Sequence, residues 1–190
     1  MIAAVIPAAG ESRRMGRPKL LLPCRGKTLL AGAVELARSV CSEVVVVVGA
    51  HCAHYRPVAR RAGARVLYHP GWRDGLSSSI RSGVAALPVA AEAALIVLPD
   101  QPFVTAEHLR ALLDAHARAG AELTFSSYSG TLGAPAVIGR PLFGALPVHG
   151  NAGAKALAAR ARLLAEVALE DPFDVDTPED ARRLAATECV

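Results

Sequence analysis

Apolar and polar positions alternate along the chain in blocks that predict strands and helices in turn. Residues 2–6 form an apolar run and residues 43–49 hold five consecutive valines, and both patterns are typical of strands buried on both faces. Between them, residues 29–39 carry apolar side chains at helical spacing. The first part of the chain therefore predicts the order strand, helix, strand.

The same alternation continues toward the C-terminus. We expect helices over residues 54–62 and 77–87, from the Thr105 cap to residue 119, and over 178–186, strands over 65–68, 93–98, 122–126 and 163–168, and short helical pieces over 141–146 and 152–159. Thr105 and Thr177 are candidate N-caps, and Gly120 is a candidate helix end. Residues 130–139 predict a loop with a short strand at 136–138.

Strands that alternate with helices form a parallel sheet covered on both faces. We therefore expect an α/β fold with a single doubly wound, mostly parallel sheet. The length of 190 residues suits one domain, which we expect to span residues 1–190.

Composition and charge narrow the range of partners. Hydrophobic residues make up 52% of the chain and charged residues 20%, which argues against disorder. The net charge of +4 could serve nucleic-acid binding, but aromatic residues are only 4% and do not interleave with the basic ones. Much of the positive charge falls within residues 13–19, so we expect a compact polyphosphate as partner and no nucleic acid.

The cysteines and the N-terminus bear on location. Cys24, Cys41, Cys52 and Cys189 show neither metal-binding nor redox spacing, so free thiols in a reducing compartment are expected. The first apolar run is too short to span a membrane and lacks the basic region of a signal peptide. We therefore expect a cytoplasmic protein with no membrane partner.

The segment after the first predicted strand is the first candidate binding site. Ligands of open parallel sheets bind beyond the carboxyl ends of the strands. Here Ala8, Ala9 and Gly10 leave the backbone accessible to an anion, and Arg14 and Lys19 can donate charge-assisted hydrogen bonds to phosphate. No Lys-Ser or Lys-Thr pair and no GxGxxG pattern follows the strand, which argues against an ATPase P-loop and a dinucleotide fold. The alternative is a solvated basic turn.

Acidic residues form the second candidate site. Asp100 follows a predicted buried strand, so it should lie on the same rim of the sheet as the first loop. A carboxylate there is a hard oxygen ligand suited to Mg²⁺ that also binds phosphate, although a plain turn residue is the alternative. Asp174 and Asp176 share one side of an extended segment, and either could be a second metal ligand. The alternative for these acids is a helix N-terminus.

A third candidate is the segment Gly75-Leu76-Ser77-Ser78-Ser79. Its hydroxyl and backbone groups could contact a nucleobase or ribose, and a serine-rich helix cap is the alternative.

Taken together, these motifs resemble those of the molybdenum cofactor cytidylyltransferases, a branch of the molybdopterin nucleotidyltransferases with a glycosyltransferase-A-like fold. The resemblance runs nearly end to end. It is carried by residues 8–20, by 75–79, by the Asp-Gln-Pro segment at 98–104, by Gly133-Ala134-Pro135, by 150–155 and by 174–180. The chain departs from the family pattern at Pro7, where Leu is usual, and at Asn151, where an acidic residue is frequent.

The resemblance implies roles for individual residues. Ala8, Ala9, Gly10, Arg14 and Lys19 would hold the triphosphate of a nucleotide, and Asp100 would bind Mg²⁺, with Asp176 as a candidate second ligand. Gly75, Ser77 and Ser78 would lie near the base. The double alanine suggests CTP, since the guanylyl branch usually has Ala-Gly-Gly there.

The expected reaction is attack by the terminal phosphate of molybdopterin or molybdenum cofactor on the α-phosphorus of CTP, with release of pyrophosphate. Arg14, Lys19 and Asp100 are the catalytic candidates, and a molybdenum hydroxylase is a candidate recipient of the product. Three alternatives stay open: guanylyl transfer from GTP, transfer to another small phosphorylated acceptor, and a non-catalytic chaperone that handles the cofactor for a molybdoenzyme.

Overall fold

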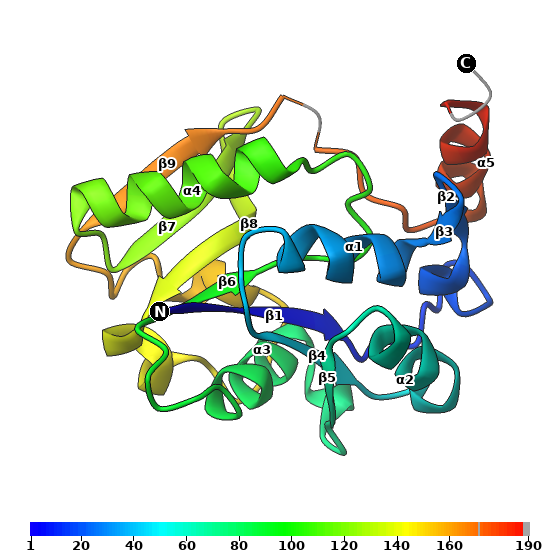
Figure 1. The fold of residues 1–190 in the computed structure, drawn as a ribbon, viewed down its shortest axis with the longest axis horizontal. Helices are drawn as coiled ribbons and strands as arrows, with labels where there is room; N and C mark the ends of the chain where they lie inside the picture. The colour runs from blue at the N-terminus through cyan, green and yellow to red at the C-terminus, as the bar shows by residue number, and fades with distance from the viewer. Residues whose placement is uncertain (171, 188–190) are drawn as a thin grey trace.

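The computed structural model describes residues 1–170 and 172–187, which hold a seven-stranded sheet (Figure 1). The strands lie in the order β5-β4-β1-β6-β8-β7-β9. Their bounds are β1 (Ile2–Ala8), β4 (Val44–Val48), β5 (Arg65–Tyr68), β6 (Ala93–Ile96), β7 (Leu123–Tyr128), β8 (Thr131–Gly139) and β9 (Leu164–Ala168). β1, β4, β5 and β6 are parallel, and β7 is parallel to β9. The sheet is thus mostly parallel, as predicted.

The centre of the sheet is apolar on both faces, which explains why the valine-rich runs form strands here. Val5 of β1 pairs with Val45 of β4 on one side and with Ile96 of β6 on the other. All three side chains are at most 1% exposed. Burial of this extent from both faces is typical of parallel strands between helical layers.

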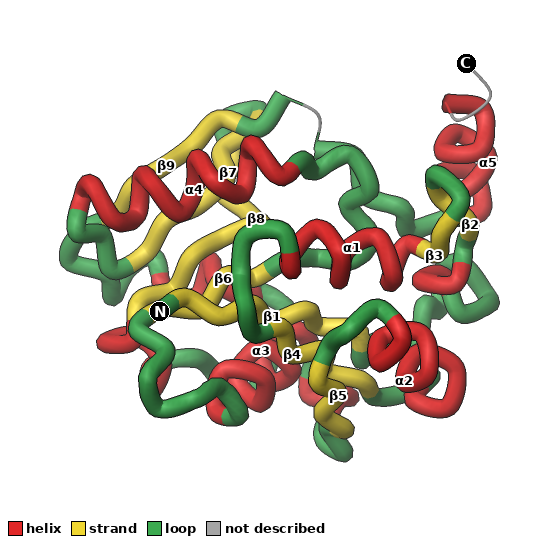
Figure 2. The backbone as a smooth tube through the Cα atoms, viewed as in Figure 1, coloured by secondary structure: helices red, strands yellow, loops and turns green. Residues whose placement is uncertain are grey.

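Helices cover the two faces of the sheet. α1 (Leu29–Arg38), α2 (Cys52–Arg61) and α4 (Ala106–Ala119) pack on one face, and α3 (Leu76–Ala85) packs on the other with the 3₁₀ helices η3 (Arg140–Ala145) and η4 (Gly153–Leu157). Figures 1 and 2 show α1 and α4 following one another across the near face. The two short helical pieces predicted in the last third are therefore present as 3₁₀ helices.

Local signals set the helix ends where the sequence predicted them. The Thr105 hydroxyl accepts a hydrogen bond from the His108 N–H at 3.2 Å, which caps α4. Gly120 ends this helix in the left-handed region, with φ of 61°. In α5 (Pro178–Thr187), Thr177 accepts from the Asp180 N–H at 3.2 Å, while the Asp180 carboxylate accepts from the Thr177 N–H at 2.8 Å. This reciprocal pair is a capping box.

The prediction for residues 130–139 was wrong. Instead of a loop with a short strand at 136–138, the segment forms the nine-residue strand β8, antiparallel to both β6 and β7. Ser129 and Gly130 both have positive φ and turn the chain from β7 into β8. Gly133 and Pro135 are residue types that disfavour strands, but the two neighbouring strands supply the hydrogen bonds that override this local preference.

Besides the apolar clusters on the two faces of the sheet, a smaller apolar core lies beyond the carboxyl end of β1. The hairpin of β2 (Pro23–Cys24) and β3 (Lys27–Thr28), which was not predicted, lies beside α5 in Figure 1. Its core includes Met15, Leu22, Leu29, Val175 and Leu184. This core anchors the segment before α5 next to the loop after β1.

Cys41 and Cys52 are free thiols, as expected, and Cys189 lies outside the described residues. Burial raises the pKa of the Cys41 thiol to about 11, which makes it unreactive. Within residues 1–170 and 172–187, no helix has the length and apolar character needed to cross a membrane.

Candidate active site

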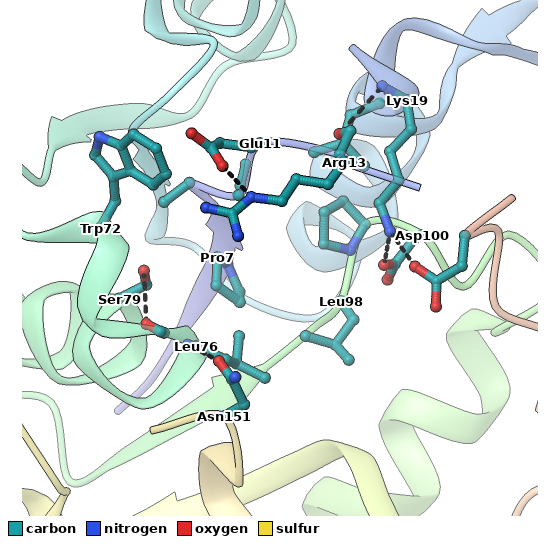
Figure 3. Close-up of a pocket in the computed structure, with 18 of the residues that line it drawn as sticks. Pro7, Glu11, Arg13, Lys19, Trp72, Leu76, Ser79, Leu98, Asp100 and Asn151 are labelled. Atoms are coloured by element: carbon teal, nitrogen blue, oxygen red, sulfur yellow. Dashed lines mark hydrogen bonds and ion pairs between the residues drawn. The ribbon is translucent and has the colours of Figure 1, made fainter. Parts of the chain in front are cut away.

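A cleft of about 490 Å³, called the main cleft here, opens at the carboxyl ends of β1 and β6 (Figure 3). Parallel strands bring the loops that follow them to one edge of the sheet. The lining residues come from four regions of the chain: Pro7–Arg14 with Lys19 and Leu20; Trp72, Arg73, Gly75, Leu76 and Ser79; Leu98–Asp100; and the later residues Asn151 and Asp176.

The loop after β1 is shaped by its own backbone hydrogen bonds. The Ser12 carbonyl accepts from the Met15 N–H at 3.0 Å, and Ser12 itself adopts a φ of 55°. The Ala9 carbonyl accepts from the Ala50 N–H at 3.0 Å, which ties the loop to the end of β4. A Cβ added at Gly10 would meet no atom within 4 Å. The backbone at Gly10 is therefore open to a ligand in the cleft.

Four charged side chains meet on one wall of the main cleft. Nζ of Lys19 lies 2.6 Å from Oδ2 of Asp100 and 2.8 Å from Oδ1 of Asp176. Nη2 of Arg14 lies 2.8 Å from Oδ2 of Asp176. We call these four residues the ionic cluster. The sequence separation between Arg14 and Asp176 shows that the fold, and not local structure, assembles it.

Lys19 is held in its charged form. Burial by itself would lower its pKa, since the side chain is only 14% exposed. The carboxylates of Asp100 and Asp176 outweigh burial, and the net effect raises the pKa of Lys19 above its usual value. The ammonium group thus stays charged at neutral pH and bridges the two carboxylates.

Backbone contacts explain how Asp176 reaches Asp100. The Val175 N–H donates a hydrogen bond to the Asp100 carbonyl at 2.9 Å, and the Val175 side chain is fully buried. The Asp180 carboxylate accepts a further bond from the Asp176 N–H at 3.1 Å. The segment is therefore fixed on both sides of Asp176.

Asp174 adds a third carboxylate to this region. Partial burial raises the pKa of Asp174, and the negative charges of Asp100 and Asp176 raise it further. A hydrogen bond from the Gln101 side chain and the charge of Lys19 act in the opposite direction. Three carboxylates against two cations leave room for a further positive charge.

The ionic cluster suits a divalent cation that arrives with phosphate. Oδ1 of Asp100 is buried and has no hydrogen-bond partner, so a hard oxygen ligand remains unused. Within residues 1–170 and 172–187, no three His, Cys, Asp or Glu side chains converge as a metal site. Asp100 and Asp176 could thus hold a cation only together with ligand or water oxygens, which is the usual arrangement for Mg²⁺.

The start of α3 packs against and hydrogen-bonds the loop at residues 150–151. Gly75 has a φ of 103°, and a Cβ there would lie 2.5 Å from the Gly150 carbonyl oxygen and 2.6 Å from Oδ1 of Asn151. The Leu76 N–H donates to that same Oδ1 at 3.2 Å. A larger residue at position 75 would open this contact, so glycine is required for the wall of the cleft.

Of the three serines in this segment, Ser77 contacts a distant loop, whereas Ser78 and Ser79 both donate to the Gly75 carbonyl, Ser79 at 3.4 Å. The Ser77 hydroxyl accepts from the Gly153 N–H at 3.1 Å, and the Ser78 hydroxyl donates to the Gly75 carbonyl at 2.8 Å. Neither residue lines the main cleft, whereas Ser79 does (Figure 3). The other predicted site residues, Ala8, Ala9, Gly10, Arg14, Lys19, Gly75, Asp100 and Asp176, all line it.

Sequence reasoning missed part of the wall opposite the ionic cluster. Trp72, the only tryptophan of the chain, lines the main cleft, and the Arg73 guanidinium lies 4.2 Å from the centre of its ring. A Cβ at Gly49 would lie 2.6 Å from the Trp72 ring, so this glycine allows the ring its position. The adjacent aromatic and basic residues Trp72 and Arg73, just before Gly75, were the feature of the sequence that could have indicated this wall.

A second cavity of about 420 Å³, the side cavity, adjoins the main cleft. Leu76, Leu98 and Asn151 line both. The side cavity is otherwise lined mainly by apolar and small residues, with Phe125, Tyr128, Gly133, Ala134 and Lys155 among them. A Cβ at Gly133 would lie only 2.0 Å from the Tyr128 hydroxyl oxygen, so glycine at 133 sets the position of that ring.

Comparison with known proteins places this arrangement in context. Residues 4–167 match the family model described as MobA-like NTP transferase domain. Nicotine blue oxidoreductase of Paenarthrobacter nicotinovorans is 34% identical, over 94% of this chain and 91% of that protein. Purine catabolism protein PucB of Bacillus subtilis is 31% identical, over 94% and 93%. Molybdenum cofactor cytidylyltransferase of Escherichia coli is 29% identical, over 74% and 71%.

Solved structures agree with the fold. Rv0371c of Mycobacterium tuberculosis has a TM-score of 0.83 and 31% identity, covering 97% of each chain. A complex of that protein with manganese has a TM-score of 0.81 and 29% identity, covering 98% of each chain.

Proposed function

We propose, from the premise that this chain belongs to the MobA-like NTP transferase family and is a nucleotidyltransferase, that it transfers CMP from CTP to the terminal phosphate of molybdopterin or molybdenum cofactor. The observation that carries this proposal is the ionic cluster on the wall of the main cleft. We further propose that the whole chain, residues 1–190, acts as one domain in this reaction.

The triphosphate would lie along the loop after β1. Gly10 offers open backbone, and Arg14 and Lys19 offer positive charge beside it. Lys19 already holds an ammonium group against two carboxylates. On nucleotide binding, this group would turn toward the phosphate oxygens and neutralise the charge that develops on departing pyrophosphate.

A divalent cation is the second part of the proposal. Asp100 and Asp176 would hold it, and we propose Mg²⁺ because carboxylate and phosphate oxygens suit that ion. The manganese complex of the relative Rv0371c supports a divalent cation in this fold. A cation held by Asp100 and Asp176 would supply positive charge that offsets the negative charge of the reacting phosphates.

The acceptor would bind in the side cavity, which meets the main cleft at Leu98 and Asn151. Phe125 and Tyr128 offer apolar surface for a flat heterocycle, and Lys155 offers a charge for an anionic group. The acceptor's terminal phosphate oxygen would then attack the α-phosphorus of CTP. The bond to the β-phosphate breaks as the new bond forms, and pyrophosphate leaves. The attacking phosphate is largely ionised near neutral pH, so no strong general base is needed.

The base would lie between the first loop and the start of α3. Gly75, Ser79 and Trp72 are the lining groups on that side, and Ser79 takes the place that the sequence suggested for Ser77 and Ser78. Ala8-Ala9-Gly10 favours CTP over GTP through the resemblance to the cytidylyl branch. A cytoplasmic location and a molybdenum hydroxylase as recipient remain predictions.

The test is pyrophosphate release from CTP, GTP and ATP with Mg²⁺, measured with and without molybdenum cofactor. We expect release with CTP and only when the cofactor is present. Release with GTP would overturn the base assignment, and release with a different phosphorylated acceptor would overturn the acceptor. No release from folded protein would favour the chaperone alternative.

A further inference from the structure

A bulge in β8 shapes one wall of the side cavity. The register of β7 and β8 shifts directly before Ser126, which lies opposite Gly133. Ala134 and Pro135 therefore fall between paired positions, and we call these two residues the β8 bulge. Phe125, Gly133 and Ala134 all line the side cavity. The shape of this wall thus depends on how the β8 bulge is held in place.

A buried hydroxyl group holds the β8 bulge. The Ser126 hydroxyl donates a hydrogen bond to the Pro135 carbonyl at 2.8 Å, and both residues are buried. Water reaches a buried carbonyl poorly, so loss of the hydroxyl would leave the Pro135 carbonyl without this donor and favour a different path of the bulge. Ser126 is therefore placed to fix the backbone next to Ala134.

His108 of α4 sets the direction of this hydrogen bond. Its Nε2 lies 2.8 Å from the Ser126 hydroxyl oxygen. The single hydroxyl proton goes to the Pro135 carbonyl, so the hydroxyl oxygen accepts from His108, and Nε2 is the nitrogen that carries a hydrogen. Burial lowers the pKa of His108, so the ring is neutral near pH 7 and keeps this arrangement. A chain of hydrogen bonds thus runs from α4 through β7 to the β8 bulge.

We propose that Ser126 and His108 are positioning residues for the acceptor, because they hold the β8 bulge in the form that shapes the side cavity. This inference rests on the proposed function, which places the acceptor in that cavity. Neither Ser126 nor His108 lines the cavity, so both act through the backbone of β8 and not by touching the acceptor.

The same helix and strand carry a second pair of this kind away from the bulge. Nδ1 of His116 lies 3.0 Å from the Thr124 hydroxyl oxygen. His116 is half-buried like His108, and burial lowers its pKa too. Thr124 is fully buried like Ser126, but it lies opposite Val137 in the regular part of the ladder. Loss of the second pair therefore removes a comparable buried hydrogen bond and leaves the β8 bulge intact.

Ser126→Ala and Thr124→Val form a matched test. Pyrophosphate release is measured at saturating CTP while the concentration of molybdenum cofactor is varied. We expect Ser126→Ala to raise the KM for the acceptor about tenfold, with the kcat and the Kd for CTP within about twofold of the wild type. Thr124→Val should leave all three quantities within about twofold. An unchanged acceptor KM in Ser126→Ala, or an equal rise in Thr124→Val, would overturn the proposal.

Substitutions of His108 test the other end of the chain without altering the sheet. His108→Leu removes the N–H donor, and we expect the acceptor KM to rise about fivefold. His108→Gln keeps an N–H donor at a similar reach, so its KM should return to within about twofold of the wild type. His116→Leu is the matched control and should leave the acceptor KM unchanged. Equal KM values for His108→Leu and His108→Gln would overturn the role of His108.

The wild type separates this inference from the proposed function. If the wild type releases pyrophosphate with CTP and molybdenum cofactor and Ser126→Ala has the same acceptor KM, only the inference fails. If the folded wild type releases no pyrophosphate under these conditions, the proposed function fails and the inference fails with it.

Discussion

The main cleft and the side cavity share a wall but differ in almost every other respect. The main cleft is built from loops that directly follow parallel strands, and four charged residues form ion pairs on one of its walls. The side cavity is lined by the antiparallel strands β7 and β8 and by η4, and Lys155 brings a charge to an otherwise mainly apolar and small lining.

This difference separates two tasks. Charge that neutralises phosphate must be placed to within a few tenths of an ångström, and Val175, the capping box of α5 and the sheet itself fix the ionic cluster in that way. Apolar surface that recognises an acceptor depends on shape, which aromatic rings such as Tyr128 provide. We therefore expect substitutions in the main cleft to change the rate of transfer, and substitutions in the side cavity to change acceptor binding.

The largest effect is expected for Asp100→Ala. The variant loses the proposed cation ligand and leaves Lys19 with one carboxylate, so turnover should fall about 10³-fold. Pyrophosphate release at saturating CTP and acceptor measures this effect. Asp176→Ala should cost less than or as much as Asp100→Ala, because Asp176 is the more exposed ligand. If Asp100→Ala turns over as fast as the wild type, the proposed cation site at Asp100 is wrong.

Lys19→Met should reduce turnover about 10²-fold, with a smaller change in the KM for CTP. The methionine keeps the length of the side chain but removes the charge that we place on departing pyrophosphate. The steady-state kcat and KM for CTP separate the two contributions. Arg17→Met is a control from the same loop, since Arg17 is exposed and does not line the main cleft. A change in the KM for CTP with an unchanged kcat would show that Lys19 binds CTP but does not stabilise the departing pyrophosphate.

Gly133→Ala should affect the other region. The added Cβ would lie 2.0 Å from the Tyr128 hydroxyl oxygen, so the ring, which lines the side cavity, must move. We expect the KM for the acceptor to rise about tenfold while the Kd for CTP changes less than twofold. Calorimetric titration with CTP and steady-state kinetics with the acceptor measure the two quantities. Gly144→Ala, at an exposed position with open space, should change neither. Weaker CTP binding in Gly133→Ala would show that the two regions are not independent.

The sequence predicted the main cleft better than the side cavity, for physical reasons. Ala8, Gly10 and Asp100 follow buried strands, and strand ends can be located from local hydrophobic runs. The strand β8 could not be located in this way, because Gly133 and Pro135 imitate a loop and only pairing with β6 and β7 makes the segment extended. Strand pairing between distant segments leaves no signal in a single sequence.

The serines before α3 show the same limit at the level of side chains. Their proximity to the cleft was predicted, but which of the three serines lines it was not. Ser77 is turned away by a bond from the Gly153 N–H, 76 residues later in the chain, and Ser79 is left on the cleft wall. Which side chains in the first turn of a helix face a cleft depends on such long-range contacts.

The smallest effect is expected for Asp174→Asn, on stability rather than on rate. A pKa raised above the ordinary value of 3.8 means that the folded protein binds this proton more tightly than the unfolded chain does. The free energy of unfolding therefore falls as pH rises through the window just above 3.8. Asparagine removes that loss, so the Tm at pH 7 should rise by about 1–2 °C, and by less in high salt because salt screens the charges of Asp100 and Asp176. The gain should vanish near pH 4, where the wild-type carboxyl also takes up its proton.

Thermal unfolding followed by circular dichroism at both pH values measures this gain in Tm. Asp114→Asn, on the exposed side of α4, is the control that should leave the Tm unchanged. A gain that persists at pH 4 would mean that the ionised form of Asp174, which partial burial and the charges of Asp100 and Asp176 disfavour, is not its source.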